Sequence, residues 1–383
     1  MINLVKDTIN NKDIDELIEW LKTYPRLTKG PETLELERDF SSWLGKKYSV
    51  FCNSGSSANL LMLSTLLQGD YYSRGAKVVV PTVCWSTDLM PVMQLGFEPI
   101  LCDVNLKDLS VDLTSLENIF KEESPEIFLY VSVLGLPTNY QKIIDLCERY
   151  GVIFLEDACE SLGSTYNGKK IGSFGEMSTF STYFGHHIST IEGGFVSTDN
   201  EHFYNVLLSI RSHGWSRDLD EESKKDLKEQ WKISNFNDFY TFYYSGYNLR
   251  STDLQAHIGK SQLKRIDSTA QKRFENFKIY QDLINNDFWK PQIPENSICS
   301  NFAYPVISPE REKITKELIE KGVETRPLIC GSMGTQPFYI KEYGEQIFQN
   351  ASVVDQYGFY LPNHQELSTD EIKFVCDIVN KYF

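Results

Sequence analysis

Residues 178–195 read STFSTYFGHHISTIEGGF. This stretch joins small and hydroxyl residues to two adjacent histidines, His186 and His187, and closes on a glycine pair. The chain holds only six histidines, so two in a row call for an explanation. A single histidine more often fills a structural position, and adjacent histidines without an HxxxH pattern do not predict a zinc site.

Two segments upstream also carry possible site residues. NSGSSAN, residues 53–59, connects a strand predicted over 49–52 to a helix predicted over 57–67. Its glycine and serines would present backbone N–H groups to a phosphate at the helix N-terminus, although a serine N-cap alone gives the same pattern. EDACE, residues 156–160, follows a predicted buried strand, where a carboxylate faces either a site or a solvated turn.

Short β-rich runs alternate with helical patterns in the first two thirds of the chain. The strands are predicted over 77–81, 99–103, 127–131 and 152–155, with a helix over 139–150. This alternation predicts a parallel sheet covered on both faces. The charged stretch 217–230 is predicted to be a solvated loop or helix.

The pattern changes after about residue 250. The expected order there is helix 254–266, helix 273–286, strand 301–307, helix 310–321 and strand 323–326. We therefore predict a large domain over residues 1–255 and a small α+β domain over 256–383.

Charge and apolar patterning exclude several functions. The net charge is 38 − 53 = −15, which disfavours general binding to DNA, RNA or anionic membranes. An anionic substrate would need a few well-placed arginines. Residues 1–24 form a charged amphipathic pattern, and no apolar run reaches about 18 residues, so a cytoplasmic location is expected.

The eight cysteines form no CxxC or CxC pair. This spacing disfavours structural zinc and clustered iron–sulfur sites, and no metal is predicted.

Six motifs in this order resemble the DegT/DnrJ/StrS sugar aminotransferase family. They are SGSSA (54–58), EDACE (156–160), F-S-x-x-x-G-x-x-I-x-T-x-E-G-G (180–194), RSHGW (211–215), GYNLR (246–250) and ETRP (324–327). The resemblance implies the type I PLP-dependent transferase (aspartate aminotransferase) fold: a large α/β domain with a mixed, mostly parallel sheet and a small C-terminal α+β domain. It also implies a pyridoxal or pyridoxamine phosphate (PLP or PMP) cofactor and a homodimer with shared active sites.

The resemblance assigns roles to matching positions. Phosphate contacts fall to Gly55, Ser56 and Ser181. Three residues would contact the cofactor ring. Trp85 would stack on its face, Asp157 would pair with the pyridinium nitrogen, and Glu160 would lie near the ring hydroxyl. The less favoured alternative for Trp85 is an aromatic residue packed after a strand. Asn248 would reach the phosphate from the neighbouring subunit, and the substrate-binding candidates are Arg250, Arg326, His213 and Trp215.

His186 departs from the family pattern, because this position holds the Schiff-base lysine in the aminotransferases. No lysine occurs between Lys170 and Lys224, so a shifted lysine has no obvious source. Imidazole cannot anchor the cofactor covalently, but it can move a proton near neutral pH. We expect its pKa to lie near the working pH.

Among relatives, a histidine at this position implies a sugar 3-dehydratase. The expected substrate is a nucleotide-linked 4-keto-6-deoxy sugar of the GDP-4-keto-6-deoxymannose type, with L-glutamate restoring PMP. The product would be a 3,6-dideoxy-4-keto sugar for surface polysaccharide. The histidine-bearing branch that acts on a CDP-hexulose has a CxC pair, which this chain lacks. Two other readings remain: an aminotransferase that uses another lysine, and a non-enzymatic PLP-binding regulator.

Overall fold

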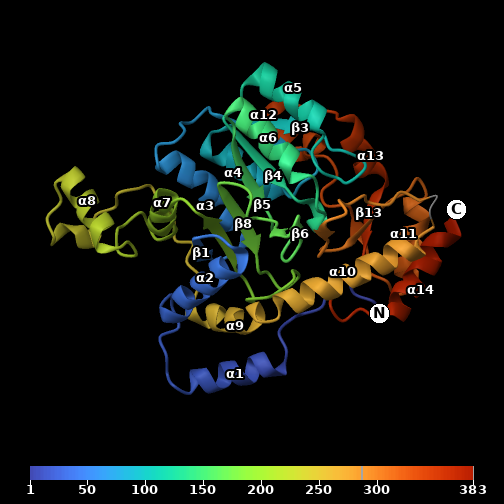
Figure 1. Ribbon diagram of the computed structural model, residues 1–383, viewed down its shortest axis with the longest axis horizontal. Helices are drawn as coiled ribbons and strands as arrows, with labels where there is room; N and C mark the ends of the chain where they lie inside the picture. Colours follow the sequence, from blue (N-terminus) through green and yellow to red (C-terminus); the bar gives the residue numbers. More distant parts are fainter. Residues whose placement is uncertain (286–287, 383) are drawn as a thin grey trace.

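A seven-stranded sheet occupies the centre of the protein (Figure 1). The structure, a computed structural model, describes residues 1–285 and 288–382. The strand order is β1 (Tyr48–Cys52), β9 (Gly194–Thr198), β8 (Met177–Ser181), β5 (Ile153–Asp157), β4 (Ile127–Val131), β2 (Lys77–Pro81) and β3 (Glu98–Cys102). β9 runs antiparallel to both of its neighbours, and the other pairings are parallel. The predicted mostly parallel α/β architecture is confirmed.

Alternating side chains of each strand face two different cores. In β2, Val78 and Val80 pack with α3 (Gly55–Gln68), α4 (Ser86–Leu95) and α7 (Glu201–Arg211). Val79 points to the opposite face, toward α2 (Pro31–Leu44), α5 (Leu113–Glu123) and α6 (Tyr140–Tyr150). Since helices cover both faces, the strands read as continuous apolar runs, as the sequence predicted.

A third core lies in the C-terminal part of the chain. It packs α10 (Ile266–Leu283), α11 (Arg311–Glu320), α13 (Gln349–Tyr357) and α14 (Thr369–Val379) around the three-stranded sheet β11 (Tyr304–Ile307), β13 (Gly358–Leu361) and β12 (Arg326–Pro327). In Figure 1, α10 leads from α9 (Asp253–Leu263) toward this core. The boundary predicted at 255/256 falls inside α9 and stays a prediction.

Several predicted boundaries in this region differ from the structure. The strand predicted from residue 301 begins at Tyr304, because the carbonyls of Asn301 and Phe302 accept hydrogen bonds from Arg273 instead of joining a ladder. The strand predicted over 323–326 is reduced to Arg326–Pro327, since residue 323 bridges to residue 2. The helix predicted over 273–286 begins seven residues earlier, at Ile266, and the last predicted residue lies outside the described ones.

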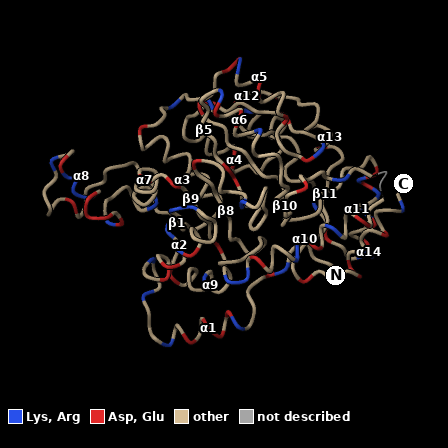
Figure 2. The backbone as a smooth tube through the Cα atoms, in the orientation of Figure 1, with Lys and Arg blue, Asp and Glu red and all other residues tan. Residues whose placement is uncertain are grey.

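The polar stretch after residue 216 projects from the body of the protein as an arm around α8 (Glu221–Trp231) (Figure 1). None of the α8 residues is buried, and Figure 2 shows acidic and basic residues following one another along it. The predicted solvated segment is confirmed. Across the described part of the chain, no helix is long and apolar enough to span a membrane.

Candidate active site

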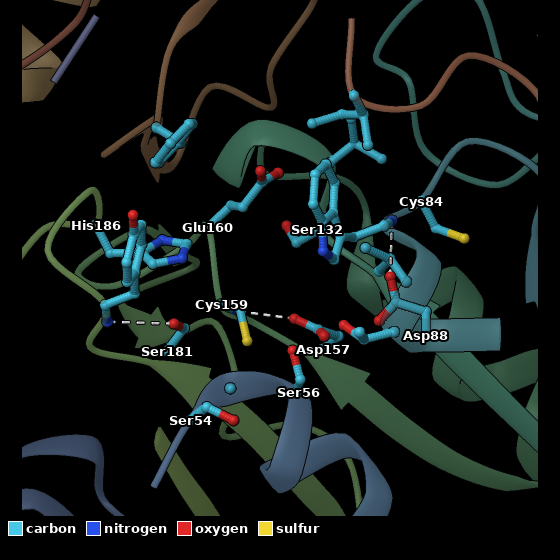
Figure 3. Close-up of a pocket in the computed structure, with 18 of the residues that line it drawn as sticks. Ser54, Ser56, Cys84, Asp88, Ser132, Asp157, Cys159, Glu160, Ser181 and His186 are labelled. Carbon is cyan, nitrogen blue, oxygen red and sulfur yellow. Dashed lines mark hydrogen bonds between the residues drawn. The ribbon is translucent and has the colours of Figure 1, made fainter. Parts of the chain in front are cut away.

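A cavity of about 360 Å³ opens at the carboxyl ends of β2, β4 and β5 (Figure 3). This is the edge at which parallel α/β sheets bind their ligands. Seven residues predicted from sequence line it together: Gly55, Ser56, Trp85, Asp157, Glu160, Ser181 and His186. They come from segments as far as 131 residues apart, so the fold brings the three motifs to one place.

The N-terminus of α3 forms one wall of the cavity. Ser54 caps the helix, its Oγ accepting from the N–H of Ser57 at 3.0 Å. The N–H groups of Gly55 and Ser56 belong to the first turn, which has no intrahelical acceptors. A Cβ on Gly55 would lie 2.6 Å from the Cβ of Ser181, so only glycine lets the helix end approach that serine. Backbone N–H groups, two serine hydroxyls and the helix dipole fit a phosphate group.

Asp157 ends β5 and is held on both of its oxygens. Oδ1 accepts from the N–H of Cys159 at 2.8 Å, and Oδ2 accepts from Nδ2 of Asn59 at 2.6 Å. The side chain is therefore fixed in direction, pointing into the cavity (Figure 3). A fixed carboxylate of this kind fits the protonated ring nitrogen of a pyridine cofactor.

Glu160 is a protonated acid at neutral pH. Burial raises the pKa of Glu160 to about 8. The hydrogen bond from the N–H of Leu134 lowers this pKa, and the negative charge of Asp157 raises it further. That bond joins the N–H of Leu134 to Oε2 at 2.6 Å. A neutral carboxyl group both donates and accepts hydrogen bonds, as a glutamine amide does.

His186 lies in the loop between β8 and β9, and its ring centroid is 5.2 Å from that of Phe302. Burial lowers the pKa of His186 to about 4, and the positive charge of Arg273 acts in the same direction while Asp157 opposes it. The expectation of a pKa near the working pH is wrong for the free protein. The imidazole is held neutral, ready to accept a proton, and its Nδ1 has no hydrogen-bond partner among the described residues.

His187 does not line the cavity and is fully buried. Its Nε2 lies 2.6 Å from the carbonyl oxygen of Ser300, so this nitrogen carries the proton and donates. Burial holds the pKa of His187 well below its usual range. This contact ties the loop to the segment before β11.

The depressed pKa of His186 predicts a loss of stability in acid. Below about pH 6.5 the unfolded chain binds a proton at this position, while the folded chain stays neutral until about pH 4. Stability should therefore fall through this window, by at most about 2 kcal/mol at about pH 5 for this group alone. Urea unfolding of wild type and His186→Asn at about pH 7 and about pH 5 measures it. We expect a smaller loss in the variant; equal losses would contradict the assignment.

Five predicted residues do not line this cavity. Four gather elsewhere: the His213 and Trp215 rings lie 5.0 Å apart, the Arg250 guanidinium carbon is 5.8 Å from the Trp215 ring, and Arg250 Nε donates to Asn248 Oδ1 at 3.1 Å. The fifth, Arg326, pairs with Glu324 at 2.5 Å and stands opposite Tyr360, which does line the cavity.

Several lining residues were not predicted from the sequence. Asp88 follows a predicted strand and could have been found from that position, because it too stands at the carboxyl edge of the sheet. Phe302 and Tyr360 come from the C-terminal core and carry no local signal. Among the described residues that line the cavity, four are acidic and none is a lysine or arginine. Among the described residues, no cluster of histidine, cysteine or acidic side chains has an arrangement suited to a metal ion.

The sheet order, the small C-terminal unit and the cavity at the strand ends define the PLP-dependent aminotransferase fold. The chain belongs to the DegT/DnrJ/EryC1/StrS aminotransferase family, which it matches over residues 7–380. The family predicted from the six motifs is confirmed.

One protein of known name and two solved structures are similar to this chain over almost its whole length. GDP-4-keto-6-deoxy-D-mannose 3-dehydratase from Yersinia pseudotuberculosis is 35% identical over 100% of this chain and 99% of that protein. A crystal structure of GDP-4-keto-6-deoxymannose-3-dehydratase, a histidine-to-asparagine mutant with bound GDP-perosamine, superposes with a TM-score of 0.92 at 30% identity, covering 99% of this chain and 100% of that one. A second structure of an enzyme of that name, with a trapped PLP-glutamate geminal diamine, gives 0.91 at 30% identity and the same coverage.

Proposed function

We propose that this protein is a PMP/PLP-dependent 3-dehydratase acting on a nucleotide-linked 4-keto-6-deoxy sugar of the GDP-4-keto-6-deoxymannose type. The observation that carries the proposal is a neutral imidazole, His186, in the same cavity as the fixed carboxylate of Asp157, with no lysine among the described lining residues. Such a site can move a proton but has no amine to hold the cofactor covalently. The names of the relatives support the same activity.

When bound, the cofactor supplies an amino group for the sugar's C4 ketone and an electron sink that lets the C3 hydroxyl leave. Gly55, Ser56 and Ser181 would hold its phosphate. Asp157 would hold the protonated ring nitrogen, and the neutral acid Glu160 would bond the ring hydroxyl.

His186 would take a proton from the cofactor's C4′ carbon, which its depressed pKa permits because the imidazole is uncharged. The same depressed pKa makes protonated His186 a stronger acid than an ordinary imidazolium. It would therefore pass the proton readily to the departing C3 hydroxyl, so one side chain serves as base and then as acid.

L-Glutamate would restore the amino group of the cofactor. The balance is one keto sugar and one glutamate consumed, with one 3,6-dideoxy-4-keto sugar, one 2-oxoglutarate and one ammonia released. An aminotransferase would keep the nitrogen in the sugar and release no ammonia.

A substrate panel tests the proposal. The purified protein is incubated with PMP, glutamate and the 4-keto-6-deoxy sugars linked to GDP, CDP, UDP and dTDP, and the sugar products are analysed by mass spectrometry. We expect a product that has lost one oxygen, formed fastest from the GDP sugar. An amino sugar as the main product would instead favour the aminotransferase.

We also propose that the active site is completed by a second copy of the chain. PMP and the nucleotide sugar are anionic, while the described residues that line the cavity include no lysine or arginine. The cluster of His213, Trp215, Asn248 and Arg250 carries suitable groups but lies outside the chain's own cavity. The nearby arm also exposes five large aromatic side chains, Trp231, Phe236, Phe239, Tyr240 and Phe242, as an unfilled interface would.

Subunit mixing tests this arrangement. Neither His186→Asn nor the double variant Asn248→Ala/Arg250→Ala should be active alone. After the two are unfolded and refolded together, a dimer with shared sites restores about one quarter of the sites, because one site of each hybrid is intact. The measurement is the rate of 3-dehydration by the co-refolded mixture, compared with the rate of each variant refolded by itself. No recovery would show that both groups act within one subunit.

A further inference from the structure

Asp88 is a second carboxyl group at the same end of the cavity as Asp157 (Figure 3). Its side chain is fully buried, with no exposed surface. Oδ2 accepts from the N–H of Trp85 at 2.9 Å, and Oδ1 accepts from Nδ2 of Asn59 at 3.0 Å. The same Nδ2 also donates to Asp157 at 2.6 Å, so one amide joins the two acids.

The amide that joins them cannot turn around. Oδ1 of Asn59 accepts from the hydroxyl of Thr179 at 2.6 Å, which directs both N–H groups of the amide toward the acids. Asn59 and Thr179 are themselves buried. Four elements, α3, α4, β5 and β8, therefore meet at this carboxyl pair.

We propose that Asp88 is a positioning residue for Asp157, which it holds through Asn59 so that a single negative charge of fixed direction faces the ring nitrogen of the cofactor. The inference rests on the proposed function, in which Asp157 meets that nitrogen. Asp88 itself touches neither cofactor nor substrate in this role.

Electrostatics require a single charge on the pair. Two buried carboxyl groups this close cannot both ionise at neutral pH. Burial, with the neighbouring Asp157 charge, raises the pKa of Asp88 well above its usual range. Asp88 therefore carries the proton and can donate it in a hydrogen bond to Asp157.

A purely local role for Asp88 would be helix capping, since it occupies the third position of α4 and accepts from the N–H of Trp85. Capping alone needs neither the bond to Asn59 nor burial beside a second acid. The two roles also predict different effects on a cofactor without a ring nitrogen.

The test measures binding to the full-length apoprotein by calorimetry with two probes. One is PMP, and the other is a carbocyclic PMP analogue with carbon in place of the ring nitrogen. The variants are Asp88→Leu, Asp88→Asn and, as a capping control, Asp112→Leu, which removes the N-cap of α5 at a distance from the cavity.

Asp88→Leu should weaken PMP binding about 10-fold or more and leave the analogue within about 3-fold of wild type. Asp88→Asn should also weaken binding of PMP more than binding of the analogue, because both oxygens of Asp88 accept hydrogen bonds and the amide NH2 that replaces one of them would face an N–H donor. The Asp112→Leu control should change neither affinity.

Equal losses for PMP and the analogue in Asp88→Leu would reduce Asp88 to a structural residue and overturn the inference, as would no loss for either. An Asp88→Asn variant that binds PMP as wild type does would show that the two hydrogen bonds accepted by Asp88 are not needed, and would also overturn it. If wild-type protein binds neither PMP nor PLP, the proposed function fails instead, so the two failures are distinguishable.

Discussion

Replacing His186 by asparagine should lower the rate of sugar 3-dehydration by about 10²–10⁴-fold, the usual contribution of a positioned proton carrier. Asparagine has a similar shape and polarity but cannot take up a proton at neutral pH. The groups that would hold the cofactor, Gly55, Ser56, Asp157 and Glu160, are not altered. PMP affinity should therefore stay close to that of wild type while turnover is lost.

The matched control is His187→Asn, one position along the chain. His187 is buried against the carbonyl of Ser300 and does not line the cavity. We expect this change to lower the unfolding free energy and to affect turnover far less. A His186→Asn enzyme with a near wild-type rate, or a His187→Asn enzyme as impaired as His186→Asn, would remove His186 from the proton-transfer role.

The variant His186→Lys should lose 3-dehydration by about 10²-fold or more and gain a covalent bond to PLP. The family places its lysine at this position, so the side chain should reach the cofactor. Burial that holds the imidazole neutral would also lower the pKa of a lysine there, leaving a reactive amine. Protonation at the sugar's C4 would then compete with loss of the C3 hydroxyl. We therefore expect some amino sugar, formed more slowly than the wild-type protein forms its 3-deoxy sugar.

Borohydride reduction followed by mass spectrometry shows the covalent bond directly. The His186→Lys chain should carry the cofactor after reduction, and the wild-type chain should carry none at this site. Product analysis with glutamate and the best substrate completes the experiment. A lysine variant that still makes the 3-deoxy sugar at close to the parent rate would show that the histidine does not select dehydration.

Much of the fold followed from local pattern. Runs such as residues 77–81 and 127–131 had to be buried on both faces, and both became strands of the central sheet. The carboxyl edge of that sheet then placed Asp157 and Glu160 in one cavity with Gly55 and Ser181. The positions of the motifs at the ends of predicted strands, together with the family resemblance, were enough for this part of the candidate site.

Interactions between distant segments could not be predicted in the same way. Arg273 draws the carbonyls of Asn301 and Phe302 out of a regular strand, a contact set by the packing of α10. Phe302 and Tyr360 reach the cavity only because the C-terminal core docks there. The depressed pKa of His186 depends on that burial and could not be read from residue type.

The fate of the glutamate nitrogen distinguishes 3-dehydration from transamination. Purified protein, PMP and GDP-4-keto-6-deoxymannose are incubated with isotopically labelled glutamate, and ammonia, 2-oxoglutarate and sugar are counted over many turnovers. The proposed function predicts one labelled ammonia and one 2-oxoglutarate for each 3-deoxy sugar, with no label retained in the sugar. Labelled nitrogen retained in the sugar, with no free ammonia, would contradict it.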